Sequence, residues 1–176
     1  MVFEMKLTVF AGTFNPIHIA HLIIAESVRD TMSCEKIMFI PSYNPPHKEN
    51  DLADAHHRFN MVKLAIADNP YFEISDIEFK MQGISYTINT IRKLYEEIPD
   101  IEGKINFIIG TDAFKEINSW HESEELVKLV NFVIIDRADI NISSSYIRER
   151  IKKGQSIKYL VSESVKEYIY GHKLYT

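Results

Sequence analysis

Two histidines three residues apart follow an apolar run near the start of the chain, in the stretch GTFNPIHIAH from Gly12 to His21. The apolar run predicts a strand, and the residues after it predict a helix that begins near Ile17. Such a helix would carry His18 and His21 on one face of its first turns. Free N–H groups and the macrodipole attract anions to a helix start, and imidazole N–H groups suit phosphate oxygens, so the pair predicts a phosphate site. A turn with two structural histidines is the alternative.

Two other residues in this stretch fit a phosphate site. Gly12 lets backbone and ligand approach closely, and Pro16 suits the entry to a helix. The stretch has neither the G-K-[ST] of a P-loop nor a G-x-G-x-x-G sequence, so the common phosphate-binding fingerprints do not apply. The prediction therefore depends on a glycine, a proline and paired histidines that share one strand-to-helix junction.

A second candidate anion site lies in the stretch ISSSYIRER, from Ile142 to Arg150. Serines at a helix start are ordinary caps, which is the alternative interpretation. No capping box is present, however, and Arg148 in the first turn would oppose the helix macrodipole. A bound polyphosphate reverses that effect, because Ser144, Ser145 and Arg148 would all donate to it.

Three further stretches could contact a nucleotide, although each is a weak signal alone. Gly110-Thr111-Asp112 follows an apolar strand: Thr111 or Asp112 could simply cap a helix, or Gly110 could admit a nucleotide while Asp112 accepts from ribose hydroxyls. The loop from Asn44 to Lys48, with His47 beside the lysine, is either a stiff linker or a lid over phosphate. The single tryptophan, Trp120, has polar neighbours, which favours ring stacking over a core position.

The elements that must position these residues alternate between strand and helix patterns. We expect strands at residues 6–11, 36–41, 71–79, 104–110 and 131–136, and helices at 20–32, 53–67, 87–98, 122–130, 145–153 and 162–170, with Gly171 at the final C′ position. This alternation predicts an α/β fold, a Rossmann-like parallel sheet with helices on both faces. The strands that end at Ala11, Pro41 and Gly110 are nearly continuous apolar runs. Ligands bind beyond the carboxyl ends of such strands, where all the candidate motifs begin.

Composition limits the classes of protein and partner. The chain has 176 residues with 45% hydrophobic and 26% charged residues, which predicts one domain over residues 1–176. The net charge of −5 argues against a nucleic-acid surface, and no apolar run predicts a signal peptide or a membrane span. The single cysteine, Cys34, excludes an internal disulfide and a cysteine-rich zinc site. We therefore expect a cytoplasmic protein with no nucleic-acid or membrane partner.

Taken together, the motifs resemble those of the HxGH nucleotidyltransferase superfamily, which has a Gly-x-Phe-x-Pro-x-His-x-x-His junction and a Ser-Ser-Ser/Thr-x-x-Arg helix start. Within it the chain is most similar to the bacterial nicotinate-nucleotide adenylyltransferase family, from Phe10 to Tyr175. The more specific signals are Pro45-Pro46-His47-Lys48, His57-Arg58, Ser85-Tyr86-Thr87, Gly110-Thr111-Asp112 with Trp120 following, and the closing YLVSESVKEYIYGHKLY.

The resemblance implies a nucleotidyltransferase enzyme of NAD biosynthesis, which transfers the adenylyl group of ATP to nicotinate mononucleotide and releases pyrophosphate. It implies ATP contacts at Gly12, Thr13, Phe14, His18, His21, Gly110, Asp112, Ser144, Ser145 and Arg148, of which His18, His21 and Arg148 would be catalytic. It implies nicotinate mononucleotide contacts at Lys48, Tyr86, Thr87, Trp120 and His121. Helices at about 143–176 would complete the ATP phosphate site, with Mg²⁺ bound through the ATP phosphates and no metal-ligating protein residues.

The chain departs from the family pattern at three places. Asn15 stands where an acid is usual, and Ala20 where glycine is usual. The connection from Ala138 to Ile142 is shorter than in most members, which would leave a sheet edge available for pairing in a homo-oligomer. The alternatives are phosphopantetheine adenylyltransferase, an enzyme that prefers nicotinamide mononucleotide, and a catalytically idle nucleotide-binding regulator.

Overall fold

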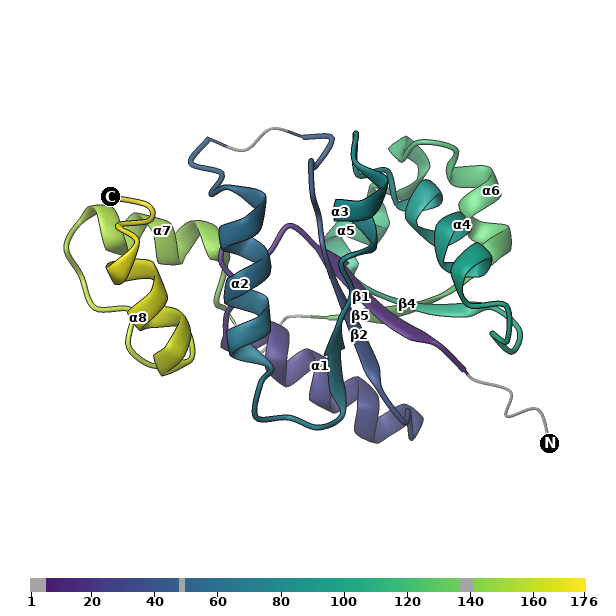
Figure 1. The fold of residues 1–176 in the computed structure, drawn as a ribbon, viewed down its shortest axis with the longest axis horizontal. Helices are drawn as coiled ribbons and strands as arrows, with labels where there is room; N and C mark the ends of the chain where they lie inside the picture. The colour runs from purple at the N-terminus through teal and green to yellow at the C-terminus, as the bar shows by residue number, and fades with distance from the viewer. Residues whose placement is uncertain (1–5, 48–49, 137–140) are drawn as a thin grey trace.

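The computed structural model describes residues 6–47, 50–136 and 141–176, which form a five-stranded parallel sheet in the order β3-β2-β1-β4-β5 with helices around it (Figure 1). The strands are β1 Thr8–Gly12, β2 Ile37–Pro41, β3 Phe72–Ile74, β4 Ile105–Gly110 and β5 Val130–Ile135. The helices are α1 Ile19–Met32, α2 Ala55–Ala65, α3 Ile77–Met81, α4 Thr87–Glu97, α5 Thr111–Lys115, the 3-10 turn η1 Ile117–Ser119, α6 Ser123–Leu129, α7 Ser144–Lys152 and α8 Glu163–Gly171. The predicted α/β fold is confirmed.

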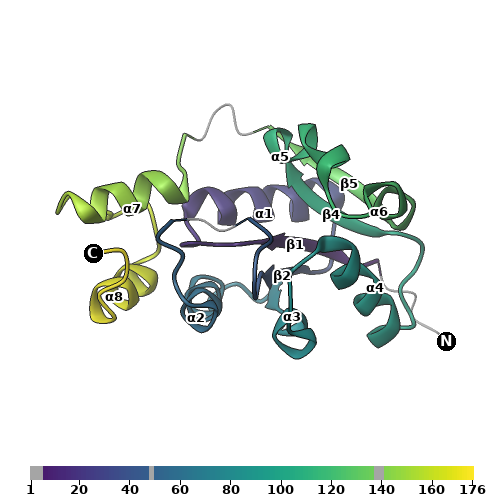
Figure 2. The same ribbon diagram turned by 90° about the horizontal axis from the view of Figure 1, so that it is seen from above.

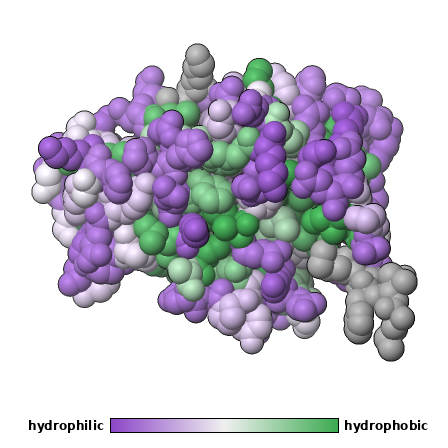
Figure 3. Space-filling view, viewed as in Figure 1, coloured by the Kyte–Doolittle hydropathy of each residue, from purple (hydrophilic) through white to green (hydrophobic). Residues whose placement is uncertain are grey.

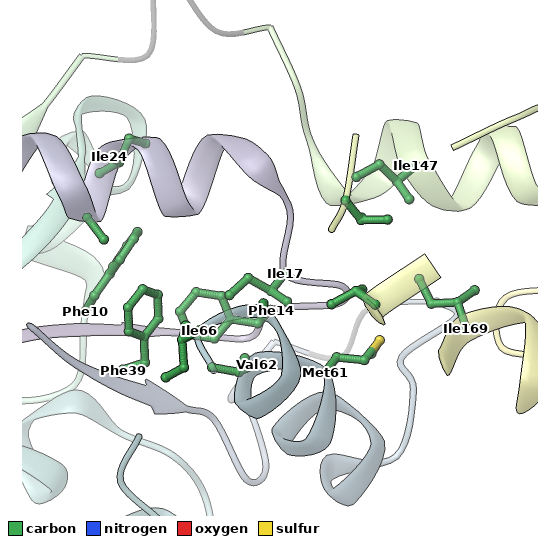
Figure 4. Close-up of a cluster of buried hydrophobic side chains, with 14 of the residues drawn as sticks. Phe10, Phe14, Ile17, Ile24, Phe39, Met61, Val62, Ile66, Ile147 and Ile169 are labelled. Atoms are coloured by element: carbon green, nitrogen blue, oxygen red, sulfur yellow. The ribbon is translucent and has the colours of Figure 1, made fainter. Parts of the chain in front are cut away.

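Each face of the sheet has its own hydrophobic core, because successive strand side chains point to opposite faces. Phe10 packs with α1, α2, α7 and α8, whereas its neighbour Val9 packs with α3, α4 and α6. Figure 2 shows this division, with α7 and α8 beyond α1 and α2 at one end of the molecule and α4 and α6 at the other. Figure 4 shows the first core, and on the face drawn in Figure 3 apolar side chains gather at the centre among polar ones.

The order of the strands places a ligand site at a defined edge of the sheet. The three strands predicted from continuous apolar runs, β2, β1 and β4, are the three central strands. From β1 the chain runs outward through β2 to β3, then returns to the other side of β1 to form β4. The strand order therefore reverses between β1 and β4, and a crevice opens beyond their carboxyl ends.

The predicted strand at residues 71–79 is wrong beyond Ile74, because the chain turns there into helix α3. The Ser75 hydroxyl accepts from the N–H of Ile77 at 3.3 Å, and Ile77 then packs into the second core. The helical turn also buries Glu78, whose carboxylate accepts from the Tyr43 N–H at 2.9 Å and from a threonine hydroxyl on α4. These contacts come from distant segments, so the local pattern could not show them.

The two C-terminal helices differ from their predicted ends by about one residue. Ser143 and Ser162 are their N-caps, accepting from the N–H groups of Tyr146 at 3.2 Å and Val165 at 3.4 Å. Gly171 is the last residue of α8 and not the C′ residue, because the helix continues to a C-cap at His172. None of the helices in the described part of the chain is long and apolar enough to cross a bilayer.

The side chain of Arg58 on α2 joins three loops at the carboxyl edge of the sheet. It is 1% exposed, and its guanidinium donates to the carbonyls of Ala53 at 3.0 Å, Thr13 at 2.8 Å and Ser42 at 2.6 Å. A fourth bond reaches the Tyr43 carbonyl at 3.2 Å. The fork of five donors in arginine suits several acceptors at once. Arg58 thereby fixes the loop after β1 to the loop after β2.

We expect Arg58→Met to lower the free energy of unfolding by about 3 kcal/mol or more, because several buried carbonyls lose their donor. Urea denaturation measures the loss. Lys63→Met on the exposed side of the same helix is the matched control, with an expected change within about 0.5 kcal/mol. A loss below about 1 kcal/mol in Arg58→Met would show that these loops are held by other contacts.

Candidate active site

A cleft of about 690 Å³ opens at the carboxyl edge of the sheet. Its walls come from the residues that follow β1, β2 and β4, the start of α4, the loop after η1 and the start of α7. Among the residues that the sequence predicts as site residues, it is lined by Gly12, Thr13, Phe14, His21, Gly110, Tyr86, Thr87, Trp120, His121 and Ser144. The fold thus brings the two outer motifs and the central motifs of the chain to one cavity.

The junction between β1 and α1 orients His21 toward one hydrogen-bonding role. The backbone N–H of His18 donates to Nδ1 of His21 at 3.2 Å, so that nitrogen is an acceptor. In the neutral imidazole the proton then lies on Nε2. The two imidazole rings stack, with centroids 3.7 Å apart, and the Phe14 ring meets His21 edge-on at 5.1 Å.

The predicted start of this helix is wrong by two residues. α1 begins at Ile19, and His18 is its N-cap with an extended backbone (φ −144°, ψ 172°). Pro16 consequently lies before the cap and not in the first helical turn. The histidines are therefore a cap and the third helical residue, not two positions on one helical face. His18 is 2% exposed, and its ring lies against that of His21, which itself faces the cleft.

The start of α7 lies directly against this junction. Ser144 donates from its hydroxyl to the Pro16 carbonyl at 2.8 Å, and Arg148 donates to the Asn15 carbonyl at 2.8 Å. Arg148 also donates to the Ser145 hydroxyl at 3.3 Å and is 8% exposed. The predicted partnership of the two outer motifs is thus present as direct hydrogen bonds across 133 residues of sequence.

The other end of the cleft is aromatic. Tyr86, the N-cap of α4, stacks on His121 with ring centroids 4.2 Å apart, and the Trp120 ring meets Phe107 edge-on at 6.4 Å. No side chain among the described residues caps the start of α4, whose first residue, Thr87, lines the cleft. The free N–H groups of a helix start favour a negative charge there.

An ion pair holds the loop that carries these aromatic residues. Arg92 on α4 donates to both carboxylate oxygens of Glu122, at 2.9 and 3.0 Å. These hydrogen bonds hold the pKa of the Glu122 carboxyl below its usual value and raise the pKa of the Arg92 guanidinium. Glu122 has a left-handed backbone (φ 50°) and directly follows His121. The pair therefore fixes the direction in which this loop leaves the cleft.

Known proteins are similar to this chain in sequence and in fold. A sequence model of the cytidylyltransferase-like family matches residues 9–150. A probable nicotinate-nucleotide adenylyltransferase of Caldicellulosiruptor bescii is 40% identical, over 94% of this chain and 96% of its own. One of Thermoanaerobacter is 38% identical, over 98% and 95%. The chain belongs to this family. The structure of Plasmodium falciparum nicotinic acid mononucleotide adenylyltransferase complexed with NaAD has the same fold, with a TM-score of 0.80 at 21% identity over 97% of each chain.

Membership of the nicotinate-nucleotide adenylyltransferase family confirms the resemblance drawn from the motifs and the nucleotidyltransferase fold that it implied. This membership decides between the nicotinate-nucleotide and the phosphopantetheine adenylyltransferase families, since these relatives carry the nicotinate name. The residue roles inside the cleft remain predictions, and the structure shows where each predicted residue lies.

Asp112 is not among the residues that line the cleft. α5 begins immediately after β4, with Gly110 as its N-cap, so neither Thr111 nor Asp112 is the cap that the sequence suggested. The Thr111 hydroxyl donates to the Ile135 carbonyl at 3.2 Å. The Asp112 carboxylate is 98% exposed, with Lys115 at 3.6 Å. Asp112 could accept from ribose hydroxyls only if the nucleotide extended over the rim of the cleft.

Several other predicted residues lie beside the cleft or outside the described part of the chain. His18, Ser145 and Arg148 lie behind its lining, at the junction of β1, α1 and α7. Lys48, predicted to reach the mononucleotide phosphate, lies outside the described residues, as does most of the Ala138–Ile142 connection. Pro45, Pro46 and His47 do line the cleft, and the motion of this loop stays a prediction.

Sequence reasoning assigned no role to three buried polar residues at the site: Asn15, Arg58 and Glu78. Asn15 was noted only as a departure from the family pattern, and Arg58 only as part of a family signal. Glu78 lines the cleft and bonds to segments on both sides of it. A charged residue inside an apolar pattern was the available signal for Glu78, because such residues are rarely buried without partners.

Gly12 allows the close approach of the Phe14 ring. A Cβ at this position would lie 3.3 Å from Phe14 Cζ. Phe14 cannot yield easily, because its ring also packs against Phe10, Phe39 and His21. We expect Gly12→Ala to displace Phe14 and His21 and to lower kcat/KM for ATP by about tenfold or more. Steady-state kinetics measures this.

The matched control is Gly171→Ala, where a Cβ would meet nothing within 4 Å. This variant should retain the kinetic constants of the parent. Equal kinetics in the two alanine variants would show that the Gly12 contact does not position the site.

Proposed function

We propose that the protein transfers the adenylyl group of ATP to nicotinate mononucleotide, forming nicotinate adenine dinucleotide and pyrophosphate. The observation that carries the proposal is a single cleft with a histidine- and serine-lined phosphate end and an aromatic end with an uncapped helix start. Relatives from this chain's own family bear the matching name, and the Plasmodium protein of the same fold is described as complexed with NaAD.

The phosphate end suits stabilisation of charge and not covalent catalysis. In this reaction a phosphate oxygen of the acceptor attacks the α-phosphorus of ATP in line, so position and electrostatics supply the rate. We assign the Nε2–H of His21 to a phosphate oxygen of ATP, because Nδ1 accepts from the backbone and the proton of the neutral ring then lies on Nε2. Its imidazole is held by the stacked ring of His18 and by Phe14, so it is already oriented before ATP binds.

The start of α7 would receive the departing pyrophosphate. Ser144 and Arg148 donate to backbone carbonyls of the β1–α1 junction, and Ser145 accepts from Arg148. We assign Ser144, Ser145 and Arg148 to the β- and γ-phosphates, which would take over some of these donors. Gly12, Thr13 and Phe14 would lie along the triphosphate, and Gly110 beside the adenosine.

The aromatic end suits a pyridine carboxylate. Tyr86 and Trp120 offer faces for stacking of the ring, and His121 lies stacked on Tyr86. The carboxylate would meet N–H groups at the start of α4, near Thr87, where the macrodipole favours a negative charge. A neutral carboxamide gains less at that position, so we propose that the nicotinate form is preferred over nicotinamide mononucleotide.

Nucleotidyltransferases generally use divalent metal ions, and we propose Mg²⁺ bound through the ATP phosphates. The lining of the cleft in the described residues contains one carboxylate, Glu78, which already accepts from Tyr43 and Thr90. In the same residues no group of three or more His, Cys, Asp or Glu side chains could hold a metal ion. This donor set fits a cation that is held by phosphate oxygens and water, where it neutralises charge on the triphosphate.

A pyrophosphate-release assay tests the function. The protein is supplied with ATP and Mg²⁺ and, in parallel, with nicotinate mononucleotide, nicotinamide mononucleotide or phosphopantetheine. We expect the fastest release with nicotinate mononucleotide, because the helix start favours its carboxylate. No release with either pyridine nucleotide would refute the proposal, and faster release with the nicotinamide form would refute the predicted acid preference.

We expect His21→Ala to lower kcat by about 10²-fold or more while changing the Kd for ATP by less than about fivefold, because its donor acts mainly on charge that develops in the transition state. Single-turnover kinetics gives the first quantity and equilibrium ATP binding the second. His56→Ala, on the exposed N-terminal turn of α2, is the matched control and should leave both unchanged. Equal losses in turnover and in binding would show that His21 only binds ATP.

A further inference from the structure

The last turn of the chain reaches back to the phosphate end of the cleft. The hydroxyl of Tyr175, the penultimate residue, donates to Oδ1 of Asn15 at 2.8 Å, across 160 residues of sequence. Tyr175 is 8% exposed and Asn15 is 1% exposed. We propose that Tyr175 is a positioning residue for adenylyl transfer, which holds the β1–α1 junction in its reactive geometry through Asn15. This inference rests on the proposed function.

Asn15 is the point where four segments meet. Its Oδ1 also accepts from the Ala53 N–H at 3.0 Å, and its Nδ2 donates to the Asp51 carbonyl at 3.2 Å. Its own carbonyl accepts from Arg148 at 2.8 Å. Asn15 therefore connects the junction to the segment before α2 and the end of the chain through its side-chain amide, and to α7 through its backbone carbonyl. Loss of the tyrosine hydroxyl would leave Oδ1 with one fewer donor in a buried position, and the amide would then be free to move.

A displacement of Asn15 would also displace Phe14, the residue before it, and the Phe14 ring contacts His21. The preceding residue, Phe14, has a left-handed backbone (φ 48°), which a bulky residue adopts only where neighbours enforce it. Its ring is 3% exposed, lies among the core side chains between α1 and α2 (Figure 4), and contacts His21 edge-on. The bonds of Asn15 hold the backbone on one side of this strained residue, and the bond from Arg58 to the Thr13 carbonyl holds it on the other. The Asn15 bonds therefore help to position the ring that contacts His21.

The turn after α8 places the Tyr175 hydroxyl against Asn15. After α8 the chain reverses through two left-handed residues, Lys173 (φ 52°) and Tyr175 itself (φ 62°). The N–H of Leu174 donates to the Ile169 carbonyl at 3.0 Å, which closes the turn. Chain termini usually fray unless contacts hold them. Here the Tyr175 ring belongs to the same hydrophobic core as Phe14, Ile147 and Ile169.

The test is Tyr175→Phe, which removes the hydroxyl and keeps the ring. We expect kcat to fall by about five- to tenfold, the effect of one lost hydrogen bond to a buried acceptor, with KM for nicotinate mononucleotide unchanged because the aromatic end is not involved. Tyr168→Phe on α8 is the matched control, since its hydroxyl bonds to His57 at 3.0 Å and Asn60 at 3.1 Å, away from the junction. This control should keep the parent kcat at a similar thermal stability.

A double-mutant cycle with Asn15→Ala adds a second readout. If Tyr175 acts through Asn15, the Tyr175→Phe change should have no further effect on kcat in the Asn15→Ala background. Should Asn15→Ala fail to fold, the comparison of Tyr175→Phe with Tyr168→Phe decides alone. The proposal is overturned if Tyr175→Phe keeps the parent kcat, or if both phenylalanine variants lose kcat in proportion to their loss of stability. A parent protein that releases no pyrophosphate would instead refute the proposed function.

Discussion

The whole phosphate end of the cleft depends on one strained connection, the loop between β1 and α1. Phe14 in this loop has a left-handed backbone, which costs on the order of 1–3 kcal/mol for a residue of this kind. Two arginines from α2 and α7 hold the residues on either side of it: Arg58 donates to the Thr13 carbonyl and Arg148 to the Asn15 carbonyl. The strain persists because hydrogen bonds from separate elements determine the position of every residue around it.

The same arginines also account for how an acidic protein can accept a triphosphate. The chain has a net charge of −5, yet Arg58 and Arg148 lie buried beside the residues that line the phosphate end. Both guanidiniums are positive charges in the buried interior, where a charge acts over a longer range than one on the surface. One pair of residues therefore supplies both the rigidity of the junction and its attraction for anions.

The sequence predicted the parts of the fold that local patterns determine. The three central strands were recognised from their nearly continuous apolar runs, because burial on both faces leaves few polar positions, and their shared edge was predicted as the site. The errors occur where distant contacts override a local pattern. α3 replaces the end of a predicted strand because buried Glu78 finds donors on the loop after β2 and on α4, and α1 starts at Ile19 because His18 bonds to His21 as a cap. The contact between Tyr175 and Asn15 spans 160 residues and has no local signal at all.

The position of Arg148 can be explained by a bound ligand or by contacts within the protein. α7 begins at Ser144, so Arg148 is its fifth residue and lies beyond the first turn that the sequence predicted for it. A bound polyphosphate is one explanation for a positive charge near this helix start. The structure supplies another, since the guanidinium donates to the Asn15 carbonyl and to the Ser145 hydroxyl. The arginine alone is thus weak evidence for phosphate. The stronger evidence is His21, whose Nδ1 accepts a backbone N–H and whose ring lines the cleft, so that Nε2 carries the proton of the neutral ring. The orientation of His21 therefore supports an anion site, whereas the hydrogen bonds of Arg148 within the protein are sufficient to explain its position.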